Sequence, residues 1–297
     1  MLNSHKDIAI PLESLFVIDY LLSEDLEKVK RLVQREYEIS EWGLDIDKKN
    51  LEDISSTKEL ITYLHKRYAK KSGASLWGQK TPRFVRHWKL LKETFPNSKF
   101  IHLVRDPRAV CNSLKNSDVH QSNMFYAVRR WKYDVQNGLD METSLDDVLR
   151  VSYEDLVQNP EGTLREITEF LNIDYNPNML SYHEAGTEEY TSYYENIHSN
   201  LKEKPKISRI TAWQKELRKE EISYVEDQCE FLMKILGYES ITEKKYPSFL
   251  PLFWWFQRLY LLCKQIMKYL LERPGYIYSF FRRKLSLTKA RLPDINK

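Results

Sequence analysis

The chain has 297 residues, of which 42% are hydrophobic, 30% charged and 13% aromatic, and it carries a formal net charge of +3. This length permits a sizeable core, and the composition is that of a soluble globular protein. Three widely spaced cysteines without a CxxC pair argue against a disulfide scaffold or a zinc site. The N-terminus lacks the basic and apolar regions of a signal peptide, so we predict a cytoplasmic protein.

The charge is distributed unevenly along the chain. Residues 245–297 hold eleven Lys/Arg and two Asp/Glu, a net charge of +9, which leaves −6 for residues 1–244. We therefore predict a main domain over residues 1–244 and a basic, aromatic, helical C-terminal extension over residues 245–297.

The extension has two open interpretations. Arg258, Lys264 and Lys268 interrupt its apolar segment before it reaches the length of a bilayer span. Aromatic and leucine residues interleaved with cations favour an interfacial helix, peripheral at the membrane, whose partner would be an anionic membrane surface contacted by residues 249–291. Alternatively, a set of large apolar side chains packs back on the main domain. That set is Phe253, Trp254, Trp255 and Leu259.

Within the main domain, hydrophobic periodicity predicts helices that alternate with two short strands. Ser56 and Glu59 form a capping box, Thr81 is a plausible N-cap before Pro82, and Gly237 is suited to end the last core helix. The predicted helices cover residues 24–38, 57–70, from 82 to before Pro96, 107–114, 122–138, from 160 onward and 219–236; the strands cover residues 100–104 and 148–151. This alternation predicts a layered α/β domain.

The clearest sequence signal is the predicted strand at 100–104, followed by the helix that Asp106 caps. Arg105 lies at the carboxyl end of the strand, where open α/β sheets bind ligands, and its planar guanidinium suits a phosphate dianion. Ser113 lies about two turns into the helix and can donate a hydroxyl to the same anion. On spacing alone, a solvated ion-pair cluster of Arg105, Asp106 and Arg108 is the alternative.

This segment, FIHLVRDPRAVCNSL (100–114), resembles the 3′-phosphate-binding segment of sulfotransferases that use 3′-phosphoadenosine 5′-phosphosulfate (PAPS). The longer stretch 79–110 is similar to the bacterial and tyrosylprotein branches of that family. VSYEDLVQNP (151–160), ISRITAW (207–213) and LNSHKDIAIPLES (2–14) resemble further family segments, in collinear order over about residues 2–237.

The resemblance implies a P-loop-like three-layer sulfotransferase fold with a short parallel sheet. It also implies the donor-binding residues: Arg105 and Ser113 would hold the 3′-phosphate, and Tyr153, Ser208 and Arg209 would line the adenosine and phosphate side. PAPS is then the co-substrate, and a hydroxyl group on a carbohydrate, lipid or peptide is the acceptor.

The same resemblance implies the catalytic residues. Glu13 matches the general base of the tyrosylprotein branch, and Lys80 matches a basic residue beside the transferring group. In-line sulfuryl transfer requires positioning and cationic stabilisation, with a carboxylate to take the acceptor proton. We predict no metal. A turn carboxylate at Glu13 and a solvated lysine at Lys80 are the alternatives.

One family feature does not occur in this sequence. The 5′-phosphosulfate loop, a G-x-x-R-S-G-T-T-L pattern after the first strand, should precede Leu2. We therefore expect the fold to lack its first strand and this loop, through a late-starting gene model, a fragment or true loss. Such a chain would bind the donor poorly or not at all.

Two other functions compete with sulfuryl transfer. GASLWGQKT (73–81) mimics a nucleotide kinase P-loop, but Gln79 is inserted before the lysine and no apolar strand precedes Gly73. A non-catalytic, membrane-associated scaffold is the third reading. No nucleic-acid partner is predicted.

Overall fold

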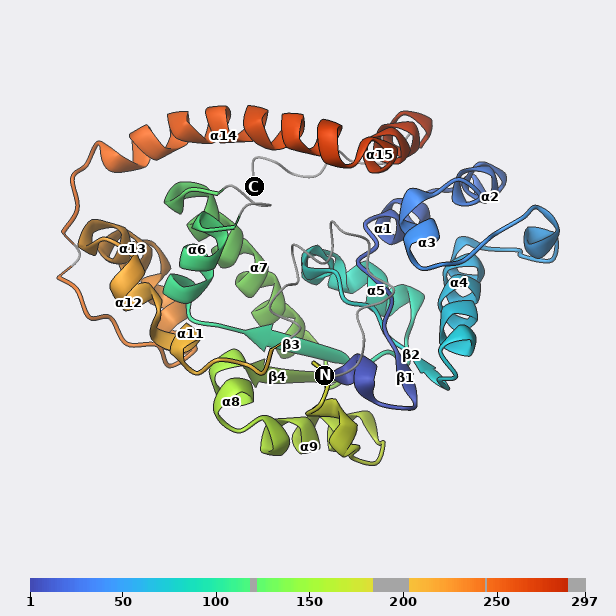
Figure 1. Ribbon diagram of the computed structural model, residues 1–297, viewed down its shortest axis with the longest axis horizontal. Coiled ribbons are helices and arrows are strands. Elements are labelled where there is room, and N and C mark those ends of the chain that lie inside the picture. The colour runs from blue at the N-terminus through green and yellow to red at the C-terminus, as the bar shows by residue number, and fades with distance from the viewer. Residues whose placement is uncertain (118–121, 184–202, 244, 288–297) are drawn as a thin grey trace. The chain divides into compact units, whose positions relative to one another are not determined.

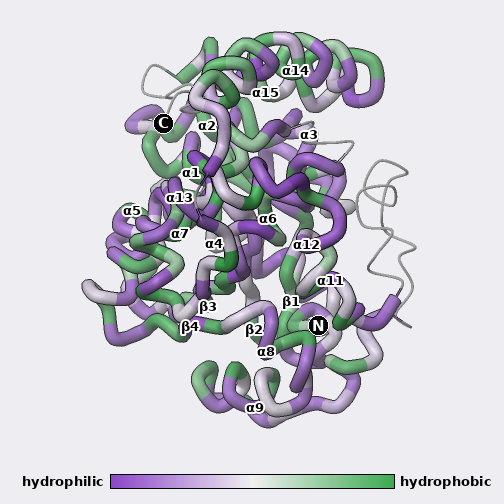
Figure 2. The backbone as a smooth tube through the Cα atoms, turned by 90° about the vertical axis from the view of Figure 1, so that its left-hand side faces the viewer, coloured by the Kyte–Doolittle hydropathy of each residue, from purple (hydrophilic) through white to green (hydrophobic). Residues whose placement is uncertain are grey.

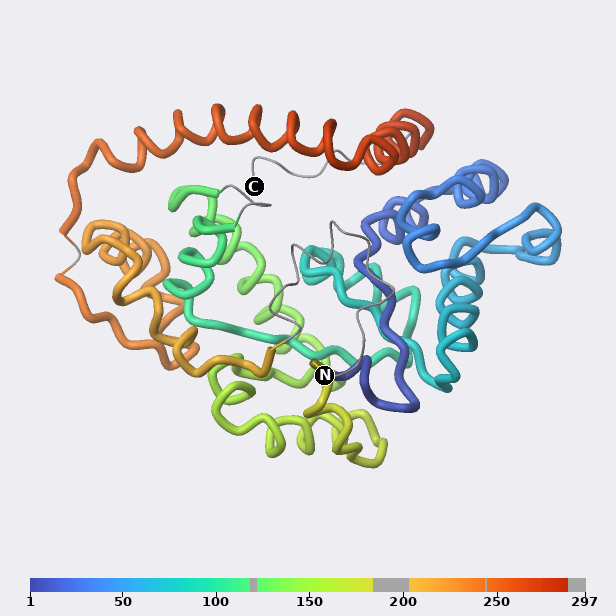
Figure 3. The backbone as a smooth tube through the Cα atoms, viewed as in Figure 1, coloured from blue at the N-terminus to red at the C-terminus, as the bar shows by residue number. Residues whose placement is uncertain are grey.

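The computed structural model describes residues 1–117, 122–183, 203–243 and 245–287, and the chain forms two compact units. Unit 1 comprises Met1–His87, Asn176–Lys204 and Tyr269–Asn296, and unit 2 comprises Trp88–Tyr175 and Pro205–Lys268 (Figures 1 and 3). The segment from residue 245 contributes to both units. The division at residue 244 that the charge pattern predicts stays a prediction.

The elements of unit 1 come from both ends of the chain. They are η1 (Leu2–Ser4), β1 (Ile8–Ala9), α1 (Phe16–Leu21), α2 (Leu26–Val33), α3 (Tyr37–Glu41), η2 (Lys49–Leu51), α4 (Thr57–Lys71), β2 (Leu76–Trp77), η3 (Pro82–His87), η4 (Pro177–Met179) and α15 (Pro274–Ser286), where η marks a 3-10 helix.

Unit 2 holds the middle of the chain. Its elements are α5 (Trp88–Thr94), β3 (Phe100–Val104), α6 (Pro107–Lys115), α7 (Met124–Ser144), β4 (Val148–Ser152), α8 (Tyr153–Gln158), α9 (Pro160–Leu171), α11 (Ser208–Thr211), α12 (Trp213–Glu216) and α13 (Lys219–Ile235). The long helix α14 (Leu250–Glu272) begins in unit 2 and ends in unit 1. Among the described residues, no helix is both long and apolar enough to span a bilayer.

Unit 2 is built around a parallel strand pair. β3 and β4 pair in register from Phe100 opposite Val148 to Val104 opposite Ser152, so the predicted strands are confirmed. α7 and α9 both pack against β4, from opposite sides, which gives the predicted helix–strand–helix layers (Figures 1 and 2). The main core lies where α6, α7 and α13 meet, around Trp131 and Val225. Because α6 follows β3 and α7 precedes β4, the packing of these two helices holds the strands in place.

Two predicted helices were wrong in detail. Residues 24–38 form two helices, because Glu36 adopts an extended conformation (ψ 118°) and directs its carboxylate to the hydroxyl groups of Tyr20 and Ser279. At Pro82 a 3-10 helix comes first, and the α-helix begins at Trp88. The Thr81 hydroxyl accepts the Ser14 N–H at 3.0 Å.

Helix α15 docks on α1 and α3 of unit 1 through a buried ion cluster. The Arg283 guanidinium, 1% exposed, lies 2.7 Å from Asp19, 2.9 Å from Glu36 and 3.3 Å from Glu38. Lys284 pairs with Asp19 at 2.6 Å. A charge this deeply buried is tolerated only when it is paired and hydrogen-bonded, so these contacts fix the place of α15 in unit 1.

We predict that Arg283→Met lowers the free energy of unfolding by about 3–5 kcal/mol, because it removes the cation beside the buried Glu36 carboxylate and leaves Asp19 paired with Lys284 alone. Urea denaturation measures this change. The neighbouring Arg282→Met is the matched control, since Arg282 only donates a 3.3 Å hydrogen bond to the Arg31 carbonyl at the surface. Equal effects of the two substitutions would contradict the role of the buried cluster.

Within this cluster, Glu38 keeps its proton near neutral pH. Burial raises its pKa to about 8, with the negative charge of Glu36 adding to the rise and Arg283 opposing it. In the unfolded chain the same carboxyl has an ordinary pKa near 4.5. Between these two values the folded state binds one more proton than the unfolded state, so the stability contributed by Glu38 falls as the pH rises from about 4.5 to about 8.

Glu38→Gln should remove this part of the pH dependence while keeping an oxygen that accepts the Leu15 N–H, now 2.8 Å from the carboxylate. The stability of the variant relative to the parent should therefore improve steadily between pH 5 and pH 8. Urea denaturation at several pH values checks the trend. Parallel curves for variant and parent would show that Glu38 is ionised in the folded state.

Candidate functional site

Two of the predicted donor-binding residues are brought together by the register of β3 and β4. Arg105 and Tyr153 are the first residues after the two strands, which end opposite each other at Val104 and Ser152. The Arg105 guanidinium lies 4.2 Å from the centre of the Tyr153 ring, within cation–π distance. The stack therefore forms at the carboxyl ends of parallel strands, the edge of a sheet at which α/β proteins bind ligands.

The hydrogen-bond donors of the Arg105 guanidinium are only partly used. Its Nη2 donates to the Arg209 carbonyl at 2.8 Å, while its buried Nε–H has no hydrogen-bond partner among the residues that the structure describes. Burial lowers the pKa of Arg105; Tyr153 and Glu154 oppose this and the Arg209 charge reinforces it. A permanently charged group with an unpaired buried donor is stabilised by an anion that accepts that hydrogen bond.

The turn after Arg105 is fixed by a buried network. Asp106 caps α6 by accepting the Arg108 N–H at 2.8 Å, and the Arg108 side chain bridges Asp106 and Glu226 at 2.7 and 2.6 Å. The same guanidinium lies 4.0 Å from the centre of the buried Trp213 ring. Asp106 and Arg108 are thus buried frame residues, and the alternative of a solvated cluster was wrong for both.

Glu154 ties the ends of the two strands together from the other side. Its carboxylate accepts the Asp106 N–H at 3.0 Å and the Tyr238 hydroxyl at 3.0 Å. Because Asp106 is also the cap of α6, this contact couples the turn after β3 to the start of α8 after β4. The Arg105 side chain is therefore held by its stack on Tyr153 and its hydrogen bond to the Arg209 carbonyl, and the next backbone position is held by Glu154.

Ser113 and Ser208 lie closer to the solvent than Arg105. Both side chains are exposed, Ser113 on α6 and Ser208 at the start of α11. α11 packs against α6, so the segment that carries Ser208 and Arg209 lies beside the helix that carries Ser113. All five predicted donor-binding residues belong to unit 2, and the hydrogen bond from Arg105 to the Arg209 carbonyl links two of their three segments.

The two predicted catalytic residues meet in unit 1. Lys80 Nζ donates a hydrogen bond to Glu13 Oε1 in a half-exposed ion pair. The pair follows the parallel strands β1 and β2, in which Ala9 lies opposite Trp77. The next residue on each segment continues the contact, because the Ser14 N–H donates to Thr81 Oγ1 at 3.0 Å.

A buried side-chain relay supports this pair. Gln79 Nε2 donates to Thr81 Oγ1 at 2.8 Å, and Gln79 Oε1 lies 2.8 Å from Nε2 of the buried His65. Gln79, which interrupts the P-loop-like spacing, is therefore a structural residue. α4 precedes Gly73 and strand β2 follows it, so this segment does not have the strand–loop–helix order of a P-loop.

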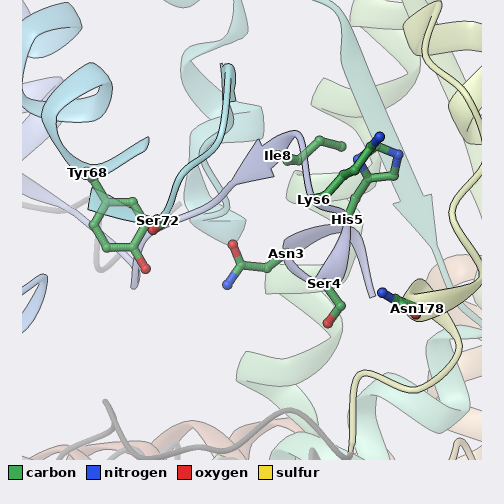
Figure 4. A pocket seen from close by; sticks show the side chains of 8 residues that line it. All are labelled: Asn3, Ser4, His5, Lys6, Ile8, Tyr68, Ser72 and Asn178. Atoms are coloured by element: carbon green, nitrogen blue, oxygen red, sulfur yellow. The ribbon is translucent and has the colours of Figure 1, made fainter. Parts of the chain in front are cut away.

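A cavity of about 310 Å³ lies in unit 1 (Figure 4). Its lining is mostly polar and includes Asn3, Lys6, Tyr68 and Asn178, with none of the predicted site residues. Over the residues that the structure describes, no group of three or more His, Cys, Asp or Glu side chains is arranged to hold a metal ion.

The sequence model of the Sulfotransferase family matches residues 1–177. The chain belongs to the sulfotransferase family. The match covers β1 to β4 and includes Glu13, Lys80, Arg105, Ser113 and Tyr153. Ser208 and Arg209 lie beyond it.

Three known proteins are similar to the chain. A putative protein-tyrosine sulfotransferase of Caenorhabditis briggsae is 29% identical over 164 residues, 52% of this chain and 57% of that protein. Mouse (Mus musculus) carbohydrate sulfotransferase 4 is 24% identical, over 52% of this chain and 46% of that protein. The solved sulfotransferase domain of the curacin biosynthetic pathway covers 81% of this chain and 92% of its own, with TM-score 0.57 and 19% identity. The chain thus has a sulfotransferase fold and spans about half the length of these curated relatives.

Sequence reasoning missed the residues that hold Arg105 in place. Glu226 lies 118 positions after Arg108 on α13, and Tyr238 lies 84 positions after Glu154. No local spacing connects such distant partners. A local signal for Glu226 was its place beside the apolar residues Ile222, Cys229 and Met233 at helical spacing, since a buried carboxylate requires a partner.

Proposed function

We propose that this protein transfers a sulfuryl group from PAPS to a hydroxyl group of an acceptor. The observation that carries the proposal is the Arg105 guanidinium, stacked on Tyr153 at the end of β3 with a buried, unpaired Nε–H. Family membership supports the reaction class, and the geometry around Arg105 supports an anionic donor.

In this proposal the unit 2 residues bind the 3′-phosphate side of the donor. Arg105 supplies the planar cation for the phosphate dianion, and Ser113 supplies an exposed hydroxyl. Tyr153, Ser208 and Arg209 line the adenosine side. The residues present therefore fit a phosphate group without a metal ion, and the buried Nε–H of Arg105 is the donor that the phosphate would satisfy.

Adenosine 3′,5′-bisphosphate should raise the melting temperature more than adenosine 5′-monophosphate at equal millimolar concentration, because only the former carries a 3′-phosphate. Because the 5′-phosphosulfate loop pattern does not occur in this sequence, we expect weak binding, and the comparison is therefore made at millimolar concentration. Arg105→Met should weaken bisphosphate binding by roughly tenfold or more, the loss of one charge-assisted hydrogen bond, and Ser113→Ala by roughly two- to tenfold. Calorimetry measures both affinities.

Arg165→Met is the control for this experiment, because Arg165 also stacks on a tyrosine, Tyr175 at 4.1 Å, but lies on α9. Its bisphosphate affinity should equal that of the parent. If both nucleotides raise the melting temperature equally, or if Arg105→Met binds the bisphosphate as the parent does, Arg105 is not a 3′-phosphate ligand.

We assign the sulfuryl-transfer step to Glu13 and Lys80. A carboxylate within reach of the acceptor hydroxyl takes its proton as the bond to sulfur forms, and the bond from sulfur to the donor phosphate oxygen breaks. The Lys80 ammonium would stabilise the charge that develops on the transferring group and the leaving phosphate. The ion pair in the structure holds both groups half-exposed, where a substrate can reach them.

Glu13→Gln should lower kcat by about 10²–10⁴-fold, because the amide cannot accept the proton, while donor binding stays near the parent value. The assay is release of adenosine 3′,5′-bisphosphate from PAPS in the presence of tyrosine peptides, glycans and hydroxylated lipids. Glu27→Gln is the matched control, since the exposed Glu27 carboxylate also pairs with a lysine, the partly buried Lys30, at 3.1 Å. Parent-like turnover by Glu13→Gln would exclude Glu13 as the base.

The acceptor is proposed at the level of its chemistry. One relative is named for protein tyrosine and another for carbohydrate, and both of these acceptors carry hydroxyl groups. A carboxylate base suits either a phenol or an alcohol. The acceptor panel in the assay above includes both classes, and also lipids.

A further inference from the structure

The outer side of α14 is a continuous apolar stripe. The stripe consists of eleven exposed apolar residues, one just before the helix and ten on it, which recur at helical spacing and span about 140° of the helix circumference, at about 100° per residue. They are Phe249, Leu252, Phe253, Phe256, Leu259, Tyr260, Cys263, Ile266, Met267, Leu270 and Leu271. We call this set the α14 stripe. On a helix of 23 residues it runs for about 34 Å, far more than the scattered apolar residues of an ordinary surface.

The opposite side of α14 attaches the helix to unit 2. Trp254 is buried, and its carbonyl accepts a hydrogen bond from the Asn123 side chain. Arg258 lies 4.2 Å from the centre of the Tyr126 ring. Trp254 and Arg258 project from the side of the helix opposite the α14 stripe. The predicted packing of Phe253, Trp255 and Leu259 onto the main domain was therefore wrong, and only Trp254 does so.

The charges beside the α14 stripe have one sign. Lys264 and Lys268 follow one edge of the stripe at helical spacing, and no Asp or Glu occurs between residues 249 and 271. An amphipathic helix with aromatic and leucine residues on one side and cations at its edge is suited to a bilayer interface with anionic headgroups. Figure 2 shows hydrophobic residues recurring along this helix.

A second copy of the chain is less well matched to this surface. In a two-fold dimer the same patch occurs on both partners, so the stripe edges would bring lysines together without any acid on this stretch. An anionic lipid surface supplies the missing negative charge. We propose that the α14 stripe docks the protein on an anionic membrane surface, with the helix lying in the interface; this inference is independent of the proposed sulfuryl transfer.

Vesicle flotation of the full chain tests the proposal. The parent should bind vesicles that contain phosphatidylglycerol at least about tenfold more tightly than pure phosphatidylcholine, and added salt should weaken the binding. The double variant Phe256→Glu/Met267→Glu should reduce binding by roughly tenfold or more, and Lys264→Glu by roughly fivefold. Phe231→Glu is the matched control, because Phe231 is 74% exposed on α13 outside the stripe.

The parent also permits a test without any stripe variant. Trp255, 45% exposed beside the α14 stripe, should be quenched by brominated phosphatidylglycerol, and Trp255→Phe should lose this quenching while still floating with the vesicles. Parent-like flotation of the double variant, equal binding to neutral vesicles, or no quenching would overturn the proposal. A lipid-free dimer that the double variant dissociates, seen by sedimentation equilibrium, would assign the stripe to a second copy instead.

Discussion

The parallel register of β3 and β4 is the constraint on which the candidate donor site depends. Because Val104 lies opposite Ser152, the residues that follow both strands emerge side by side, and a guanidinium stacks on a phenol ring. A slip of one residue would turn Arg105 to the other face. The buried bridge from Asp106 through Arg108 to Glu226 prevents such a slip, since each carboxylate would lose its counter-charge.

Electrostatics shows how this bridge is tolerated. Burial raises the pKa of Glu226, but hydrogen bonds from Thr242, Ile241 and Arg108 outweigh it, so the pKa is lowered overall and the carboxylate is held in its charged form. Arg108 thus uses its hydrogen bonds to hold the turn after β3 in place, whereas Arg105 keeps a donor at the strand end that pairs with none of the described residues. Two arginines three residues apart in one turn have opposite roles, one structural and one suited to a ligand.

Local patterns predicted the strand, cap and helix around Arg105 because each signal lies within a few residues: an apolar run, Asp106 before Pro107, and helical spacing after it. The break in the predicted helix 24–38 was not predictable in this way. It depends on Glu36, whose partner Ser279 lies 243 residues later. The exposure of Phe253 and the burial of Trp254 were equally hidden, because both are apolar residues of one segment and only packing distinguishes them.

Because distant packing is not visible in local patterns, the structure also changes the interpretation of the basic C-terminal extension. Its net charge of +9 predicted a basic C-terminal extension, yet Arg273, Arg283 and Lys284 are paired with acids of unit 1. These cations fix α15 in place and contribute little to an external field, because their charge is compensated at short range. In the proposed docking, the lysines beside the α14 stripe therefore contribute to the attraction to an anionic surface. A tail read as a single basic element is two elements: an ion-paired anchor in unit 1, and an amphipathic helix whose apolar side faces outward.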